Sequence, residues 1–200
     1  MLEERNDNDL VAAYRAGDSK ALEGLMRRHH DDLIRFLHRL TGDRASAEDV
    51  FQDTFLQIHV SADTFDPSRR FKPWLFTIAA NKARDLLRRN ARRRTLDLDS
   101  PIGGRNGAGG ATFVDLMQVR VPQPGAAVGD AERDSLVQSA VSQLPISLRE
   151  VLLLAYFQKM SYSQIADTLD IPLGTVKSRL HAAVAAFARK WQILSKGKLE

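Results

Sequence analysis

The chain has 200 residues, of which 44% are hydrophobic, so it can bury one large or two small cores and is not disordered as a whole. Its formal net charge is +4 and its pI is near 9.6, and the clustering of its basic residues suggests a polyanionic partner. Cysteine is absent, which excludes disulfides and thiolate metal sites and fits a reducing cytoplasm. The acidic, polar N-terminus argues against a signal peptide, and no apolar run is long enough to insert into a membrane.

Residues 8–94 carry helical patterns throughout. A first helix is expected from a cap at Asn8 or Asp9 to Ala16, and a second begins with Ser19 as its cap. The second helix carries apolar residues spaced three and four apart, which predicts a core-facing stripe. The stripe consists of Leu22, Met26, His29, Leu33, Phe36, Leu37 and Leu40.

A third helix is predicted from Ser46, which forms a capping-box pattern with Asp49, to about Ala62. Its apolar residues group on one side and its acidic and amide residues on another. The apolar group is Phe51, Phe55 and Ile58, and the polar group is Glu48, Asp49, Gln52 and Asp53. Such an acidic face either binds a basic protein surface or is simply solvated; spacing alone does not decide.

A turn at residues 66–68 leads into a fourth helix, expected from about Lys72 to Arg94. Aromatic and basic side chains are interleaved around this turn, and that pattern can stack unpaired bases. Trp74 and Phe76 are expected in the core. The predicted nucleic-acid ligands here are Phe65, Arg69, Arg70 and Lys72.

The second half of the fourth helix is strongly basic, with seven basic residues from Lys82 to Arg94 and one acid, Asp85. Such a stripe suits a phosphate backbone, although it can also be a solvated face that complements the helix dipole. Nucleic acid is the favoured interpretation because a DNA-reading motif occurs later in the chain. The predicted contacts on this helix are Asn81, Lys82, Arg84, Arg88 and Arg89.

Glycine and proline crowd residues 96–129, which show no sustained periodicity and are expected to form a flexible linker. An apolar island at Phe113, Val114, Leu116 and Met117 either docks on a domain or partner or forms one helical turn. Helices are again expected at about 131–143 and 147–158, separated by Leu144 and Pro145.

Residues 161–180 have the pattern of a helix-turn-helix. A short apolar stripe ends at Leu169, Pro172 cannot continue the helix, and a second helix opens at Gly174 and Thr175. The N-terminal end of such a second helix enters the major groove, where basic and hydroxyl side chains bond bases and phosphates. The residues predicted to face outward there are Thr175, Lys177, Ser178 and Arg179. An ordinary surface hairpin is the alternative.

Signatures of catalysis and of metal binding are weak. His29 and His30 are adjacent, so they point to different sides of a helix, and no His-x-x-x-His pattern exists. There is no Walker loop, and the carboxylates show no arrangement for acid–base chemistry. We therefore expect no catalytic residue, no metal ion and no cofactor.

Four motifs, in order, resemble bacterial RNA polymerase sigma factors of the extracytoplasmic-function (ECF) type. They are AEDVFQDTF at 47–55, WLFTIAAN at 74–81, DLLRR at 85–89 and GTVKSRL at 174–180. The resemblance covers both helical segments and skips the linker. It implies an all-α fold of two small domains: 1–95 for core polymerase and the −10 element, and 130–200, a four-helix domain with the helix-turn-helix, for the −35 element. Residues 96–129 are the Gly/Pro-rich linker, which would thread toward the polymerase active-site and RNA-exit region.

The resemblance also implies a role for each predicted site. Asp49, Gln52 and Asp53 would bind the clamp helices of the polymerase largest subunit. The loop from Ser61 to Phe71, with the basic helix after it, would capture the melted −10 strand, and the helix-turn-helix would read the −35 duplex. A promoter-specificity subunit is therefore expected, with core RNA polymerase, promoter DNA and an anti-sigma protein as partners.

Three residues depart from the family pattern: His59 stands where an aromatic is common, Ala80 where arginine is common, and Asp170 where glycine is common. Asp tolerates the left-handed conformation, so the turn at Asp170 is expected to survive. The alternative function is a stand-alone helix-turn-helix regulator whose N-terminal domain senses a ligand or dimerises. That alternative predicts tight duplex binding without polymerase.

Overall fold

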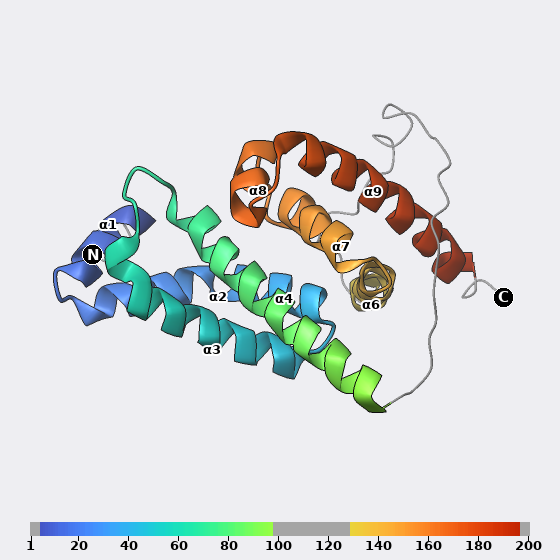
Figure 1. Ribbon diagram of the computed structural model, residues 1–200, viewed down its shortest axis with the longest axis horizontal. Coiled ribbons are helices and arrows are strands. Elements are labelled where there is room, and N and C mark those ends of the chain that lie inside the picture. Colours follow the sequence, from blue (N-terminus) through green and yellow to red (C-terminus); the bar gives the residue numbers. More distant parts are fainter. Residues whose placement is uncertain (1–4, 98–128, 197–200) are drawn as a thin grey trace.

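The computed structural model describes residues 5–97 and 129–196, and these residues form two groups of helices without a strand (Figure 1). The first group contains α1 (Asp7–Arg15), α2 (Ser19–Thr41), α3 (Arg44–Ser61), the short 3₁₀ helix η1 (Ala62–Thr64) and α4 (Phe71–Asp97). The second group contains α6 (Gly129–Ser142), α7 (Ile146–Leu152), the π-helical turn η2 (Leu153–Phe157), α8 (Tyr162–Leu169) and α9 (Leu173–Lys196). The predicted all-α fold with two helical domains is confirmed.

The predicted linker and its apolar island lie outside the described residues, except that residues 96–97 belong to α4 and residue 129 to α6. None of the helices in the described part of the chain combines the length and the apolar character that a membrane crossing requires.

The first three helices begin earlier than predicted because an Asn or Asp upstream of the expected cap accepts a hydrogen bond from a backbone N–H in the first turn. Asn6 caps α1 by accepting from the N–H of Asp9 at 2.9 Å. Asp18 caps α2, and Asp43 caps α3 through the N–H of Ser46 at 2.7 Å. The predicted caps were therefore wrong by one to three residues, whereas the helices themselves were correctly placed.

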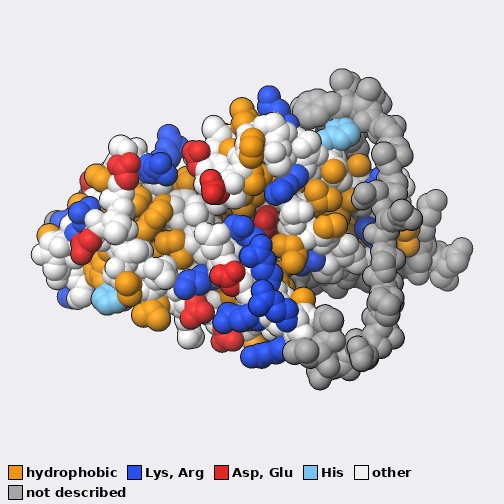
Figure 2. Space-filling model, in the orientation of Figure 1, with side chains coloured by type: hydrophobic (Ala, Val, Ile, Leu, Met, Phe, Trp, Pro, Cys, Tyr) orange, Lys and Arg blue, Asp and Glu red, His pale blue; other side chains and the backbone are white. Residues whose placement is uncertain are grey.

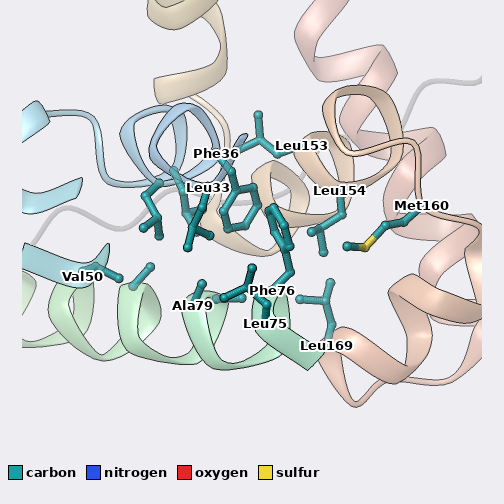
Figure 3. Close-up of a cluster of buried hydrophobic side chains, with 14 of the residues drawn as sticks. Leu33, Phe36, Val50, Leu75, Phe76, Ala79, Leu153, Leu154, Met160 and Leu169 are labelled. Atoms are coloured by element: carbon teal, nitrogen blue, oxygen red, sulfur yellow. The ribbon is translucent and has the colours of Figure 1, made fainter. Parts of the chain in front are cut away.

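One hydrophobic core runs through both groups of helices (Figure 3). Phe36 of α2 packs edge-to-face on Phe76 of α4, with ring centroids 5.1 Å apart. On the far side lie residues of the second domain. These are Leu153 and Leu154 of η2, Met160, and Leu169 of α8. The helix-turn-helix domain thus packs directly on α2 and α4.

The turn of the helix-turn-helix has the predicted conformation. Ser161 and Gln164 form a capping box at the start of α8, and Asp170 ends that helix in the left-handed region with φ 51° and ψ 54°. The carbonyl of Pro172 then accepts from the N–H groups of Thr175 and Val176, at 2.8 and 3.1 Å. α9 consequently begins at Leu173, one residue before the predicted start.

The conformation of Asp170 predicts opposite effects for two substitutions. Asp170→Gly should keep or raise the free energy of unfolding, because glycine adopts positive φ without a Cβ clash. Asp170→Val should lower it by about 1–2 kcal/mol, because a β-branched side chain opposes that conformation. Urea unfolding of the two variants checks this, and equal stabilities would contradict the role of the turn.

Candidate nucleic-acid and protein interfaces

The predicted acidic face lies on the exposed side of α3. Val50, Thr54 and Ile58 are buried against the core, which leaves Asp49, Gln52 and Asp53 exposed, as predicted. Sequence reasoning missed that the face continues into two exposed apolar side chains. Leu56 is 62% and Val60 71% exposed, and their spacing of three and four residues from Asp53 and Leu56 was the available signal.

α4 lies beside α3, and a pocket of about 350 Å³ separates the acidic face from the basic end of α4. One wall carries the acidic and amide side chains of α3, and the other carries arginine. The lining residues are Asp49, Gln52, Asp53, Leu86, Arg89, Asn90 and Arg93. The structure therefore brings together parts of two sites that the sequence analysis had kept separate.

Phe65 is not available as a ligand, which corrects the sequence-based prediction. Its side chain is 3% exposed and packs on Trp74, with ring centroids 4.9 Å apart, and on Phe71. An aromatic next to a basic loop can serve the core or a ligand, and here the other aromatics enclose it. Asp66 to Arg70 follow as an exposed loop, in which Arg69 Nε lies 3.7 Å from Asp66 Oδ2 and both Arg69 and Arg70 are open to solvent.

Lys and Arg side chains gather along the C-terminal half of α4 (Figure 2). Asn81, Arg88 and Arg89 are exposed there, although Asn81 Oδ1 accepts a hydrogen bond from Arg84 at 2.5 Å and Arg88 lies 4.0 Å from Asp85. Two other predicted contacts are engaged within the domain. Lys72 Nζ lies 3.4 Å from Asp32 Oδ2, and Lys82 Nζ donates to Gln57 Oε1 at 3.3 Å.

Arg84 is engaged with the second domain. Its Nε lies 2.9 Å from Oε1 of Glu150 in α7, whose side chain is only 4% exposed. The N–H of Arg84 Nε donates to the carbonyl of Ala80 instead, so the contact between Arg84 and Glu150 is an ion pair without a hydrogen bond. Oε1 of Glu150 accepts no hydrogen bond from any described residue. Burial therefore raises the pKa of Glu150 to about 7.

Four arginines from three helices oppose that shift and favour the charged form of Glu150. They are Arg84 and Arg88 of α4, Arg179 of α9, and Arg149 beside Glu150 in α7. Residues predicted to bind the −10 and −35 elements thus surround one buried carboxylate. Sequence reasoning missed Glu150 because it lies in a helix that carries no DNA-binding motif.

The recognition helix α9 presents only part of its predicted set to solvent. Lys177 and Ser178 are exposed at its N-terminal end. Thr175 and Arg179 are half-buried, and Arg179 faces the side on which Glu150 lies. Arg179 was expected to face outward, and it is half-buried because α9 packs on α7, the helix that carries Glu150, within the second domain.

Comparison with known proteins matches both domains. Residues 25–93 match Sigma-70 region 2, and residues 135–187 match Sigma-70, region 4. The chain is similar to the ECF RNA polymerase sigma factor SigW of Bacillus subtilis, with 30% identity over 180 residues, 90% of this chain and 94% of that protein. It is 36% identical to the ECF RNA polymerase sigma factor SigL of Mycobacterium tuberculosis H37Rv over 180 residues, 88% of this chain and 92% of that one. Among solved structures, CnrH in complex with the cytosolic domain of CnrY has a TM-score of 0.63 at 26% identity, covering 92% of this chain and 95% of that chain.

The raised pKa of Glu150 predicts how stability changes with pH. Because the pKa rises from 4.5 to about 7, the stabilising contribution of Glu150 is complete below about pH 4.5 and is lost as the pH rises through about 7. Glu150→Gln removes this titration. The difference in free energy of unfolding between wild type and variant should therefore change by about 3 kcal/mol over that range.

Urea unfolding of both proteins at several pH values measures that difference, in which the other titrating groups cancel. Glu23→Gln, which replaces an exposed carboxylate on α2, is the matched control for the substitution itself. A pH-independent difference for Glu150→Gln would contradict the assigned burial.

Proposed function

The chain belongs to the ECF family of RNA polymerase sigma factors, and we propose that α3 binds polymerase while α4 and α9 bind the promoter. As a member of that family it is a promoter-specificity subunit that acts in transcription initiation. The observation that carries the assignment is the presence of both sigma regions, in order, in a chain that spans nearly the full length of its relatives. We assign residues 1–95 to polymerase and −10 binding, and 130–200 to −35 binding.

The polymerase contact is proposed for Asp49, Gln52 and Asp53. Their exposure on a helix whose opposite side is buried supports this assignment. Leu56 and Val60 extend the same face, so the surface suits a partner that offers basic groups and an apolar patch.

The −10 contact is proposed for the exposed loop and the exposed side of α4. The exposure of Arg69 and Arg70 in the loop, and of Asn81, Arg88 and Arg89 on the helix, supports this assignment. Lys72, Lys82 and Arg84 would have to leave their present partners, and Phe65 supports the loop from beneath.

The −35 contact is proposed for the N-terminal end of α9, where Lys177 and Ser178 are exposed and Thr175 and Arg179 are half-buried. Glu150 pairs with Arg84 across the two domains and is also favoured in its charged form by Arg179 of its own domain, so one arginine from each proposed DNA contact lies near a protein carboxylate. We propose that the free protein binds promoters poorly. Each site is weak alone, and holding both on polymerase raises their effective concentration.

A protein of the anti-sigma class is proposed as a further partner. CnrH, whose structure this chain resembles over most of both chains, is in complex with the cytosolic domain of CnrY, and the sigma factor RpoE from Bartonella quintana is in complex with the anti-sigma factor NepR. No catalytic activity is proposed for this chain, since its relatives are named as sigma factors.

Transcription with purified core polymerase tests the proposal directly. Genomic promoter fragments are transcribed with and without this protein, and specific initiation should appear only when it is present. A stand-alone regulator would instead bind duplex DNA tightly without polymerase. Tight binding to duplex DNA without core enzyme, together with no initiation, would overturn the proposed function.

Asp49→Ala combined with Asp53→Ala should weaken binding to core polymerase by about tenfold, or ~1.4 kcal/mol, because both carboxylates are exposed on the proposed surface. Thermal unfolding should be unchanged. Glu23→Ala is the control, since Glu23 is an exposed carboxylate on α2, outside the proposed surface, and pairs with Arg27 of the same helix at 2.7 Å. Unchanged affinity of the double variant in a titration with core enzyme would remove the polymerase role from α3.

Arg179→Ala should reduce −35 recognition in a manner that depends on sequence. If the guanidinium pairs with a guanine, its loss costs about 1–3 kcal/mol on the cognate site and less on a single-base variant. Lys177→Ala is the paired comparison. If Lys177 contacts a phosphate, its loss should weaken binding equally on every DNA sequence and lower the salt slope by about one unit. Holoenzyme affinities on matched and altered sites at two salt concentrations measure both. No effect of either variant would show that α9 does not face DNA.

A further inference from the structure

One side chain of α1, Asn8, makes three hydrogen bonds to the loop between η1 and α4. Its Nδ2 donates to the carbonyls of Pro67 and Arg69, at 2.9 and 2.8 Å. Its Oδ1 accepts from the N–H of Phe71 at 3.2 Å. Both amide hydrogens and the amide oxygen are therefore used on alternate residues of one loop.

Little else fixes the backbone of this loop between its ends. Asp66 accepts from the N–H of Ser68 at 2.9 Å, and the N–H of Arg69 donates to the carbonyl of Asp66 at 3.0 Å. Phe65 and Phe71 bury the two ends. Asp66 to Arg70 are all exposed, so core packing does not set their conformation.

α1 lies along the loop and contacts both of its ends. Arg15, at the far end of α1 from Asn8, donates to the carbonyl of Phe65 at 3.5 Å and lies 3.7 Å from Asp63. The hydroxyl of Tyr14 also bonds Nδ1 of His59. α1 therefore contacts both ends of the loop: Arg15 bonds the end at Phe65, and Asn8 bonds the end that carries Arg69 and Arg70.

α1 is itself fixed to α2 without help from the loop. Asp7 lies 2.8 Å from both His29 and Arg28, and Leu10 and Val11 are buried. Burial would raise the pKa of Asp7, but the bonds from His29 and Arg28 outweigh it and lower the pKa. The helix that carries Asn8 is therefore held in place by α2, independently of the loop that Asn8 bonds.

We propose that Asn8 is a positioning residue for promoter recognition: it fixes the backbone at 67–71 and so places Arg69 and Arg70 against the unpaired −10 strand. The inference rests on the proposed function of that loop. A loop already ordered in the free protein loses less conformational entropy on binding. Removal of Asn8 should weaken strand binding although no charge changes.

The test compares two neighbouring asparagines. Asn8→Ala removes all three bonds to the loop. Asn8→Asp keeps the oxygen that accepts from the N–H of Phe71. It replaces the N–H donor with a carboxylate oxygen, which repels the carbonyls of Pro67 and Arg69. Asn6→Ala is the matched control, because Asn6 caps the same helix through the N–H of Asp9 and makes no bond to the loop. Arg88→Glu with Arg89→Glu tests strand binding by the domain independently of Asn8.

Each holoenzyme variant is titrated with a fluorescent −10 non-template strand and, separately, with a −35 duplex. Asn8→Ala and Asn8→Asp should weaken strand binding about tenfold, consistent with the loss of two or three hydrogen bonds. Binding to the −35 duplex should stay unchanged for both variants. The salt slope should stay unchanged for Asn8→Ala, which alters no charge and removes no phosphate contact. Asn6→Ala should bind the strand as wild type does.

Any of four results would overturn the proposal. Equal effects of Asn6→Ala and Asn8→Ala, or equal loss on strand and duplex, would mean that Asn8 merely stabilises α1. Normal strand binding by Asn8→Ala, with weak binding by the Arg88 and Arg89 variant, would reject the positioning role and leave the proposed function standing. Normal binding by every variant would reject the −10 assignment itself.

Discussion

The packing of Phe76 against Phe36 determines where the two surfaces proposed to bind DNA lie. Phe76 belongs to α4, which carries the basic stripe, and the core around this pair includes Leu154 and Leu169 of the helix-turn-helix domain. Each large side chain that is fully buried contributes about 1.5–3 kcal/mol. The two domains are therefore joined by a continuous core and by the linker, and the orientation of α9 relative to α4 follows from that core.

The polar contacts at this junction determine how the two domains are arranged more than they add to stability. Arg149 is buried and donates to the carbonyls of Leu40 at 2.6 Å and Leu144 at 3.0 Å, which ties α2 to the second domain. Glu150 is a costlier group, because a buried carboxylate gains from nearby arginines only part of what it loses on leaving water. Such a contact favours one arrangement of the domains over others while adding little net stability.

The sequence predicted the elements whose signal is local. The turn at Asp170 and the exposed face of α3 each depend on residues within a few turns of one another, and each is present. The apolar stripe of α2 is buried as predicted from His29 to Leu40, but Ala21 and Leu25 are buried at its start, where Leu22 and Met26 are only partly buried. The cap positions were less predictable, since Asp43 and Ser46 are both good caps and only the backbone path selects between them. The prediction that Phe65 binds nucleic acid was wrong for a related reason, because its burial depends on the aromatic side chains that pack around it.

Contacts between distant segments could not be read from spacing. Asn8 meets Pro67, and Arg84 meets Glu150, only because the helices that carry them are packed together. Both contacts involve residues without a motif of their own. Functional side chains can be listed from a family pattern, whereas the residues that hold them in place depend on the tertiary structure.

The shared core also constrains how the domains can separate on polymerase. Separation would expose Phe76, Leu153 and Leu154 to water, at a cost of several kcal/mol by their buried area. It would at the same time return Glu150 to water, where its pKa falls toward 4.5 and its charge is solvated. These two effects oppose each other, and the apolar one is larger at neutral pH because it involves several side chains. A separated state therefore needs a partner that binds the two domains more tightly apart than together, which places the driving force for opening in the polymerase rather than in this chain.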